Sequence, residues 1–501
     1  MCTPLIILIN DKMHVNLQNI LSTAISSMLL SREKIMKIHV TLVNPPYPHG
    51  SHLHTPFIPL GLGYMAAILE KNNYQVDVID CQALQLSYEE AKSEIEKRQP
   101  TIVGITSTTL TYKSALKIVG MAKEVCPECL TVMGGSHVTF WDENALQECP
   151  ELDIVVRREG ENTFLEIVEK LEADKSFDDT IGITCRKNSQ IIRNPDRPYI
   201  ENLDDLPFPA IHLWPMESLR INGEVMFPLM TSRGCAYWCK YCSAVRMGGR
   251  KYRVRSPKNV VDEIEHLNKK FGAKRFTFYD DAFTVDQFRA KEICEQIINR
   301  KMKIKWNCET RVDSVTKELL FKMKESGCTD VWFGVESGSQ LIINAMDKGF
   351  KIEKTIRAFK WAKEAGLMTV SDTILGFPGE TRETAWETIK FVEKLEPDDV
   401  AYYIATPYPG TPLYDEVKDN GLLQITDFDK YDTATPTFTN PSLETNELME
   451  IREKAFQRFY LRPKYMLSVF IKGGVYGPAS TRLVLAHLRR AVKAKLLLTH
   501  S

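Results

Sequence analysis

Short apolar runs alternate with amphipathic stretches between residues 36 and 185. The apolar runs are rich in β-branched residues, as strands are, and they cover 38–43, 75–79, 102–105, 130–133 and 154–156. The amphipathic stretches have the helical period and include 60–71, 113–124 and 163–171. Alternation of this kind predicts a parallel sheet with helices on both faces, which is a doubly wound, Rossmann-like α/β domain.

A second series of alternating elements follows, between residues 222 and 420. Six candidate strands lie at 226–231, 275–279, 303–308, 330–335, 369–375 and 400–405. Helical patterns stand between them, for example at 260–271, 316–326, 354–365 and 384–395. Six such units predict a partial (β/α)6 barrel of the TIM type, whose active residues are expected at the carboxyl ends of its strands.

These patterns divide the chain into parts. Met36 opens the first strand pattern, so residues 1–35 are either an extension or the result of a start codon placed too early. The expected parts are a first domain at 36–190, a linker at 191–221, the barrel at 222–420 and a basic helical C-terminal region at 421–501.

Charge is distributed unevenly along the chain. The net charge is −1, but residues 451–501 carry eleven Lys and Arg against one acidic residue, Glu453. The first 450 residues therefore carry −11, which disfavours nucleic-acid binding because phosphates would be repelled.

No apolar run reaches the roughly 18 residues that span a bilayer. Twelve scattered cysteines suit a reducing, cytoplasmic setting.

The last part of the chain has the pattern of an amphipathic helix. Ser480 is a candidate N-cap, and leucines and a valine recur on one face with basic residues on the other: Leu485, Leu488, Val492 and Leu496 against Arg482, Arg489, Arg490 and Lys493. A basic amphipathic helix can lie on an anionic membrane surface. The alternative is a solvated helix that packs on the protein through its apolar stripe.

Three cysteines stand close together after the first barrel strand. Cys235, Cys239 and Cys242 have the spacing C-x-x-x-C-x-x-C on one loop. Three thiolates leave one iron of a 4Fe-4S cluster open, since four cysteines usually hold such a cluster. A three-cysteine zinc site is the alternative, but structural zinc normally has four ligands. The spacing, with an aromatic residue (Tyr241) before the last cysteine, resembles the radical S-adenosylmethionine (radical SAM) superfamily.

The first domain resembles the cobalamin-binding domain of cobalamin-dependent radical SAM enzymes. The resemblance rests on the opening Asn-Pro-Pro, the loop after the third strand, the Gly-Gly-x-His and Gly-Glu-x-Thr turns, and the linker 206–210. It implies a set of cofactor contacts, which are Asn44, Ser107, Thr108, Gly134, Gly135, His137, Gly160 and Glu161. None of the ten histidines stands in an Asp-x-His-x-x-Gly pattern, which points to cobalamin bound without a histidine ligand. For His137, a turn-capping role is the alternative.

In the barrel, the resemblance implies S-adenosylmethionine contacts at successive strand ends. The expected cofactor-binding residues are Tyr241, Asp280, Asp281, Glu336, Ser337, Gly376 and Gly379, and the expected catalytic residues are Arg311 and Tyr408. Glu336 would accept hydrogen bonds from ribose hydroxyls, and Arg311 would neutralise a carboxylate. The alternatives are an internal salt bridge for Glu336 and Arg311, helix capping for Asp280 and Asp281, and a core aromatic role for Tyr408.

The resemblance implies an enzyme with three cofactors: a 4Fe-4S cluster, S-adenosylmethionine and cobalamin. Its expected reaction is reductive cleavage of S-adenosylmethionine to a 5′-deoxyadenosyl radical, followed by methylation of an unactivated carbon. An oxidative, ring-forming reaction similar to that of tetrapyrrole cyclases is one alternative, and a non-catalytic iron–sulfur protein is another. The expected partners are a small-molecule or lipid substrate and an electron donor of the ferredoxin or flavodoxin type. We expect a cytoplasmic protein with peripheral contact to the inner face of the membrane through its basic tail.

Overall fold

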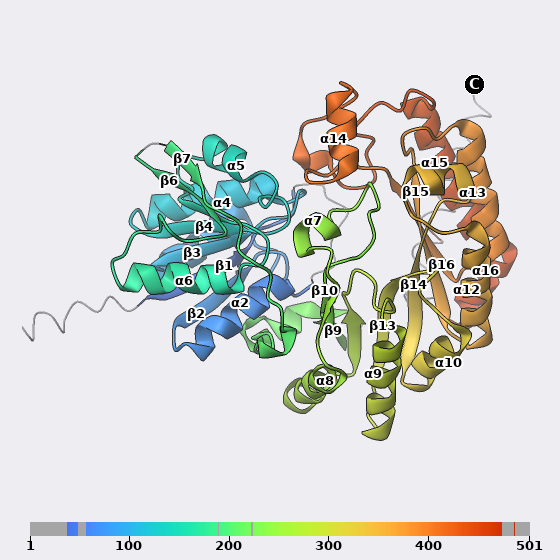
Figure 1. Cartoon of the computed structure of the whole chain (residues 1–501), viewed down its shortest axis with the longest axis horizontal. Helices are drawn as coiled ribbons and strands as arrows, with labels where there is room; N and C mark the ends of the chain where they lie inside the picture. The colour runs from blue at the N-terminus through green and yellow to red at the C-terminus, as the bar shows by residue number, and fades with distance from the viewer. Residues whose placement is uncertain (1–37, 49–56, 189, 222–223, 473–484, 486–501) are drawn as a thin grey trace, which may run out of the picture.

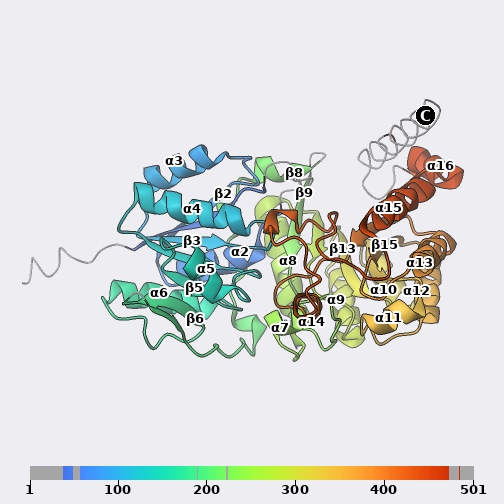
Figure 2. The same cartoon turned by 90° about the horizontal axis from the view of Figure 1, so that it is seen from above.

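The computed structural model describes residues 38–48, 57–188, 190–221, 224–472 and 485. The expectations for residues 1–35, and for the amphipathic helix around 480–496 except Leu485 itself, lie outside these ranges. Within them, no helix is long and apolar enough to cross a membrane. Two seven-stranded sheets stand side by side and account for most of the fold (Figures 1 and 2).

The first sheet has the order β2-β1-β3-β4-β5-β6-β7. Its five parallel strands are β1 (His39–Asn44), β2 (Gln75–Asp80), β3 (Ile102–Thr106), β4 (Leu130–Gly134) and β5 (Ile154–Val156). The chain leaves β1 in one direction for β2 and returns for β3, so the order reverses between β1 and β3. Ligands of such sheets bind at that reversal, beyond the carboxyl ends of the strands.

Helices cover both faces of the first sheet, as predicted. They are α2 (Leu60–Lys71), α3 (Tyr88–Arg98), α4 (Tyr112–Val125), α5 (Asp142–Glu148) and α6 (Glu161–Glu172). Helices α2 and α6 pack with Leu42 and Val132 on one face, and α3 and α4 pack with Val43 and Met133 on the other. Because both faces are covered, the strands bury mostly apolar residues, although the edge strand β2 also carries Gln75 and Asp77. The antiparallel hairpin β6 (Ile183–Lys187) and β7 (Gln190–Arg193) was not predicted.

The second sheet is the predicted partial barrel. Strands β9 (Glu224–Leu229), β12 (Arg275–Phe278), β13 (Lys305–Arg311), β14 (Cys328–Glu336), β15 (Met368–Leu375) and β16 (Asp399–Ile404) pair in parallel and in sequence order. The short β8 (Arg220–Ile221) adds an antiparallel edge. The helices between them are α8 (Pro257–Phe271), α9 (Gln287–Asn299), α10 (Lys317–Glu325), α11 (Gln340–Ala345), α12 (Ile352–Glu364) and α13 (Arg382–Leu395).

Local sequence signals explain where these helices begin and end. Ser256 caps α8 by accepting from the Asn259 amide, Pro257 occupies the first helical position, and Gly272 ends the helix in the left-handed conformation. The four barrel helices expected from their helical pattern, at 260–271, 316–326, 354–365 and 384–395, agree with α8, α10, α12 and α13 to within three residues at each end.

The cysteine loop carries a small structure of its own above the barrel. It lies between β10 (Ser232–Arg233) and β11 (Arg253–Val254), which pair antiparallel, and includes the short helix α7 (Ala244–Gly248). In Figure 1, α7 lies between the first sheet and the barrel. The Arg246 guanidinium of α7 lies 2.8 Å from Asp415 of α14 (Pro412–Asp419), which fixes the loop to the C-terminal part of the barrel.

The chain after β16 returns to the first domain. A 3-10 turn, η4 (Phe428–Lys430), places Phe428 in the core between α4 and β4, with its ring centroid 4.5 Å from that of His137. The chain then packs α15 (Thr445–Tyr460) on α13 and continues into α16 (Pro463–Lys472). The C-terminal region therefore joins the two sheets, an arrangement that hydrophobic patterning did not indicate.

Candidate active site

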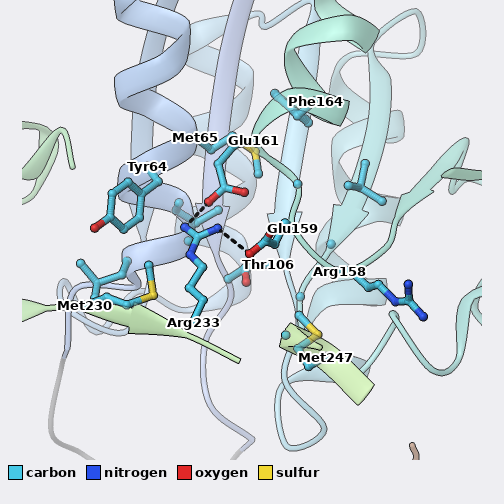
Figure 3. A pocket seen from close by; sticks show the side chains of 18 of the residues that line it. Tyr64, Met65, Thr106, Arg158, Glu159, Glu161, Phe164, Met230, Arg233 and Met247 are labelled. Carbon is cyan, nitrogen blue, oxygen red and sulfur yellow. Dashed lines mark hydrogen bonds and ion pairs between the residues drawn. The ribbon is translucent and has the colours of Figure 1, made fainter. Parts of the chain in front are cut away.

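One cavity lies where the carboxyl ends of the two sheets face each other. Its volume is about 1180 Å³ when the solvent-filled space at its open mouth is included, and it is lined from both domains. The first sheet supplies Thr106, Gly134, Gly135 and the loop 158–161. The barrel supplies Met230, the start of the cysteine loop at 232–234, Tyr279 and Asp281. Figure 3 shows these walls converging. A ligand in this cavity touches both domains at once.

The inner end of the cavity is an apolar slot inside the first domain. Gly104 of β3 and Val132 of β4 form one side, and Leu62, Met65 and Phe164 of α2 and α6 form the other. A Cβ at Gly104 would stand 2.8 Å from Leu42 and 3.1 Å from the Phe164 ring. Gly104 thus lets Leu42 and Phe164 pack directly against β3, and the slot beside them has apolar walls.

The Gly-Gly turn fits tightly against the preceding loop. Gly135 has φ +111°, and a Cβ there would lie 2.8 Å from the Ser107 amide nitrogen and closer still to its carbonyl oxygen. Only glycine fits both the backbone angle and the space. The turn therefore brings bare backbone to the cavity wall, as the sequence predicted for Gly134 and Gly135.

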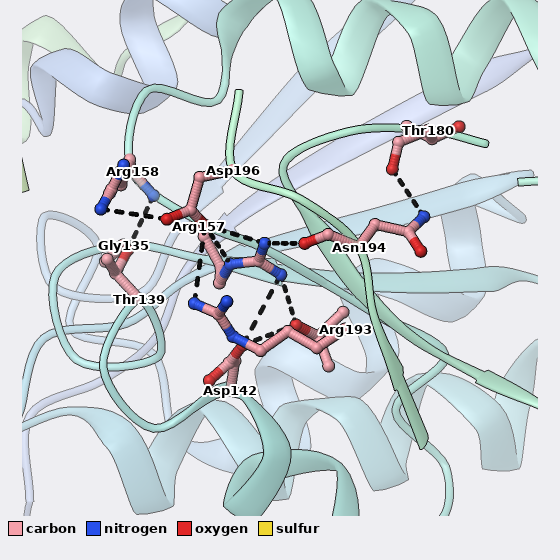
Figure 4. A network of polar contacts seen from close by, with 10 residues as sticks. Gly135, Thr139, Asp142, Arg157, Arg158, Thr180, Arg193, Asn194 and Asp196 are labelled. Atoms are coloured by element: carbon pink, nitrogen blue, oxygen red, sulfur yellow. Dashed lines mark hydrogen bonds and ion pairs between the residues drawn. The ribbon is translucent and has the colours of Figure 1, made fainter. Parts of the chain in front are cut away.

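The loop 157–161 is held by a buried polar network (Figure 4). Arg157 is fully buried and donates to Thr184, to the Asn194 carbonyl and to Asp196. Arg158 has φ +60°, donates its amide to Thr139 Oγ1 and pairs with Asp196 at 3.0 Å. The network fixes a strained backbone, which places Arg158 and Glu159 on the cavity wall.

Four residues predicted to contact a cofactor in the first domain lie outside the cavity lining. Asn44 Nδ2 donates to Asp80 Oδ1 at 2.8 Å, and Ser107 is buried beneath the Gly-Gly turn. Thr108 is exposed, and its amide and hydroxyl bond Thr111. In place of Ser107 and Thr108, their neighbour Thr106 lines the cavity. These polar residues shape the loops behind the cavity wall, and their direct contact with a cofactor stays a prediction.

His137, the fourth, is a core residue with 1% exposure. Its Nδ1 lies 3.2 Å from Thr109 Oγ1, and its ring packs against Tyr112 and Phe428. Burial lowers the pKa of His137 to about 3, so the ring is neutral. The geometry supports the turn-capping alternative rather than the predicted cofactor contact.

In the described part of the chain, Cys235, Cys239 and Cys242 are free thiols. Arg311 lies against them: its Nη1 is 3.7 Å from Cys239 Sγ, and its guanidinium stacks 3.6 Å from the Tyr237 ring centroid. Asp313 holds Arg311 from the other side at 2.8 Å. Arg311 therefore lies beside the cysteines, as predicted, and it also forms the internal salt bridge that was the alternative.

A second polar group joins the cysteine loop to β14. Lys348 Nζ donates to Glu336 Oε1 at 2.5 Å and to the Tyr241 hydroxyl at 2.8 Å. Glu336 has φ +63°, and a Cβ at Gly334 would lie 2.5 Å from its Oε1. Glu336 thus forms the internal salt bridge that was the alternative to ribose binding. Its neighbour Ser337 is buried and hydrogen-bonds Thr388. Ser337 therefore stabilises the end of β14 from within the protein.

The two aspartates after β12 have different positions. Asp280 is buried and accepts from the Thr231 amide and hydroxyl and from Ser232, so it anchors the start of the cysteine loop. Asp281 lines the cavity. Burial, with the Asp280 charge nearby, raises the pKa of Asp281 to about 6. Only Asp281 is placed to meet a ligand, and neither residue caps a helix in the observed contacts.

Three residues predicted at the last strand ends lie outside the cavity lining. Gly376 faces α15, where a Cβ would stand 2.6 Å from Leu448, and Gly379 has open space around it. Tyr408 packs against Tyr431, and its hydroxyl donates to the Tyr431 carbonyl at 3.1 Å. A catalytic role for Tyr408 is not supported by this position, which is that of the core aromatic alternative.

Comparisons with known proteins agree with this two-part site. A model of the radical SAM superfamily matches residues 229–392, and a model of the B12 binding domain matches residues 50–168. An uncharacterized methyltransferase of Pyrococcus horikoshii is 37% identical over 436 residues, which cover 87% of this chain and 94% of that protein. The chain belongs to the cobalamin-dependent radical SAM methyltransferase family.

Two further comparisons concern a curated relative and a solved structure. An anaerobic magnesium-protoporphyrin IX monomethyl ester cyclase of Rubrivivax gelatinosus is 30% identical over 446 residues, covering 87% of this chain and 80% of the cyclase. The fold matches the solved structure of TsrM, a radical S-adenosylmethionine methyltransferase from Kitasatospora setae, with TM-score 0.67 and 20% identity over 77% of this chain and 78% of that one. The predicted fold and family are confirmed, and the non-catalytic alternative is excluded.

The cofactors of this radical SAM enzyme are a 4Fe-4S cluster, S-adenosylmethionine and cobalamin, and its residues fit them. Among the described residues, no three His, Cys, Asp or Glu side chains are gathered closely enough for a single metal ion. Three cysteine thiolates would hold three irons of a four-iron cluster and leave the fourth iron open, since four thiolates normally hold such a cluster. The glycine-lined wall and apolar slot fit a large planar cofactor with a tail.

Sequence reasoning missed several residues of the enzyme's site. Arg233 pairs with Glu161 and Glu159 across the domain boundary, and Lys348 links Tyr241 to Glu336. Inside the barrel, burial together with Glu309 and Glu336 raises the pKa of Asp372 well above its usual range. The only sequence signal was position: Arg233 precedes Cys235 by two residues, and Asp372 lies on a barrel strand with polar neighbours.

Proposed function

We propose that the enzyme transfers a methyl group to an unactivated carbon of a largely apolar substrate. The observation that carries the proposal is this cavity, because the glycine turn of the cobalamin domain and the start of the cysteine loop form its opposite walls. A substrate held there stands between both cofactor sites without leaving the protein.

When bound, the cluster and S-adenosylmethionine supply radical hydrogen abstraction, and cobalamin supplies the methyl group. The protein's residues bind and orient these groups. Cys235, Cys239 and Cys242 are the thiolate ligands, and Arg311 places a positive charge beside Cys239. Asp281 offers a carboxylate on the cavity wall for a cationic amino group. Methionine and phenylalanine walls exclude water from a reaction that water would quench.

An apolar ring system is the substrate class that we favour. Phe57 and Tyr279 are 42% and 37% exposed, and their rings meet edge to face with centroids 5.8 Å apart. Tyr279 also lines the cavity. Exposed aromatic rings at a site entrance often mark a surface for an apolar partner. This pair supports an isoprenoid, lipid or tetrapyrrole scaffold over a small polar metabolite.

The basic pattern of residues 479–501 supports peripheral contact with the inner membrane surface, where lipid substrates reside. We propose that this tail brings the enzyme there, and that a ferredoxin- or flavodoxin-type carrier supplies electrons. Deletion of 479–501 should abolish sedimentation with anionic liposomes. Unchanged sedimentation would remove the membrane proposal and leave the methyl-transfer proposal intact.

Oxidative ring formation is the second candidate, because the cyclase of Rubrivivax gelatinosus is 30% identical over 87% of this chain. The two reactions differ in their products. Methyl transfer forms S-adenosylhomocysteine together with 5′-deoxyadenosine, whereas ring formation needs no methyl donor. Anaerobic assays with reconstituted enzyme, methyl-deuterated S-adenosylmethionine and lipid extracts should yield a deuterated product in wild type only, with Cys239→Ala as control. 5′-deoxyadenosine formed with an unlabelled cyclised product would favour the second candidate.

A further inference from the structure

An ion pair joins the cobalamin domain to the cysteine loop. Arg233, two residues before Cys235, lies 2.5 Å from Glu161 Oε1 and 3.2 Å from Glu159 Oε1 (Figure 3). Glu161 is the first residue of α6 and Glu159 belongs to the strained loop that precedes it. The side chain that opens the cysteine loop thus holds the cofactor-facing loop of the other domain.

The surroundings of Arg233 give it little freedom. Arg253 lies directly opposite on the paired strand β11, where two like charges repel. Glu159 offsets this repulsion: its Oε2 accepts a hydrogen bond from Arg253 Nη1 at 3.0 Å, and its Oε1 forms ion pairs with both arginines, 3.2 Å from Arg233 and 2.8 Å from Arg253. Tyr64 of α2 lies under the Arg233 guanidinium, 5.3 Å from ring centroid to Cζ. Moving the loop 159–161 therefore also moves Arg233.

Glu161 keeps one oxygen for a ligand. The residue is only 4% exposed, and among the described residues Oε2 has no hydrogen-bond partner. Glu161 lines the cavity beside Gly160 and Thr106. A buried carboxylate oxygen without a partner is costly unless a donor meets it. The donors that a corrin ring presents at its edge are primary carboxamides.

We propose that Glu161 is a shared acceptor: Oε2 accepts from a side-chain carboxamide of cobalamin, while Oε1 holds Arg233 and through it the cysteine loop. A cofactor amide that fixes Glu161 also fixes the position of Arg233 two residues from the first cluster ligand. Cluster assembly fixes the same arginine from the other side. Cobalamin binding and cluster assembly are then linked, and each raises the affinity for the other.

The inference concerns cofactor assembly and does not depend on which carbon is methylated. It therefore holds or fails separately from the proposed function, and it can be tested without substrate. The full-length chain is titrated with hydroxocobalamin by absorption spectroscopy, once with the reconstituted cluster and once without it. The measured quantity is the ratio of the two dissociation constants within each variant, which cancels general losses of affinity.

In wild type we expect cobalamin to bind roughly 5–150-fold more tightly to the cluster-loaded protein, the usual range of coupling between two sites. Arg233→Gln and Glu161→Gln should each bring the ratio close to one. Arg300→Gln is the matched control, because Arg300 pairs with Asp262 and Glu265 on the outer helices. It should keep the wild-type ratio.

Two results would overturn the proposal: a wild-type ratio of one, or a wild-type ratio that persists in both Arg233→Gln and Glu161→Gln. If Arg233→Gln does not fold, as judged by its circular dichroism, Arg233→Lys replaces it. Lysine keeps the charge but cannot meet two carboxylates with a planar fork, so an intermediate ratio is expected and an unchanged one counts against the proposal. The double variant tests the link further, because removing both partners should change the ratio no more than removing either.

Discussion

Lys348 Nζ lies 2.8 Å from the hydroxyl of Tyr241, and this contact ties the cysteine loop to strand β14 through Glu336. Lys348 and Glu336 are both buried. A buried ion pair costs much to desolvate, and the loss of one partner leaves the other charge uncompensated. The pair therefore holds the strained Glu336 backbone and Tyr241 in one arrangement next to the cluster ligands.

Lys348→Met should destabilise the fold more than most single substitutions. Removing one member of a buried ion pair typically lowers the free energy of unfolding by about 3–5 kcal/mol. The double variant Lys348→Met/Glu336→Gln should lose less than the sum of the two single variants, because no lone charge remains. Thermal unfolding of the cluster-free proteins measures this. Additive losses would show that the two side chains do not act as a pair.

Gly135→Ala should weaken cobalamin binding. The added Cβ would contact the Ser107 backbone, and φ +111° is unfavourable for any residue with a side chain. We expect the dissociation constant for hydroxocobalamin to rise at least about tenfold, equivalent to roughly 1.4 kcal/mol. Gly120→Ala on α4 is the control, since nothing lies within 4 Å of its added Cβ. Tight binding by Gly135→Ala would show that the turn does not shape the site.

Arg311→Gln should lower the reduction potential of the cluster. Reduction adds negative charge, which the guanidinium 3.7 Å from Cys239 Sγ stabilises. A Coulomb interaction of roughly 2 kcal/mol corresponds to roughly 90 mV for one electron. Potentiometric titration followed by electron paramagnetic resonance measures the shift. A potential in Arg311→Gln equal to that of Arg300→Gln would contradict an electrostatic role.

The elements that could be predicted are those whose pattern is local. The strands β1 to β5 and the six barrel strands were predicted because burial on both faces makes them apolar and because Gly, Pro and Ser mark their ends. The cluster cysteines were found because their spacing is itself the signal. The hairpin β6–β7 was not predicted, since the exposed Arg186, Lys187 and Gln190 break the apolar alternation.

The contacts of the site could be predicted only in part. Gly134, Gly135, Gly160, Glu161 and Asp281 line the cavity as expected, because loops at the carboxyl ends of parallel strands converge. Asn44, Ser107 and His137 have suitable chemistry but point elsewhere, and the direction of a side chain in a loop depends on tertiary packing. The insertion of Phe428 beside His137 joins residues 291 positions apart, which no local pattern encodes.

Glu380 gives the enzyme a pH-dependent stability. It is fully buried after β15, and burial raises the pKa of its carboxyl to about 8, from an ordinary value of 4.5. The folded state therefore binds a proton that the unfolded state has lost between these two values. Stability from this group is complete below about pH 4.5 and declines as the pH rises to about 8.

Glutamine is neutral at every pH and can accept the same hydrogen bond from the Gly376 amide. The unfolding midpoint of Glu380→Gln should match wild type near pH 5 and exceed it by several degrees near pH 8.5, as measured by circular dichroism. A constant difference between the two proteins across this range would show that Glu380 does not titrate there.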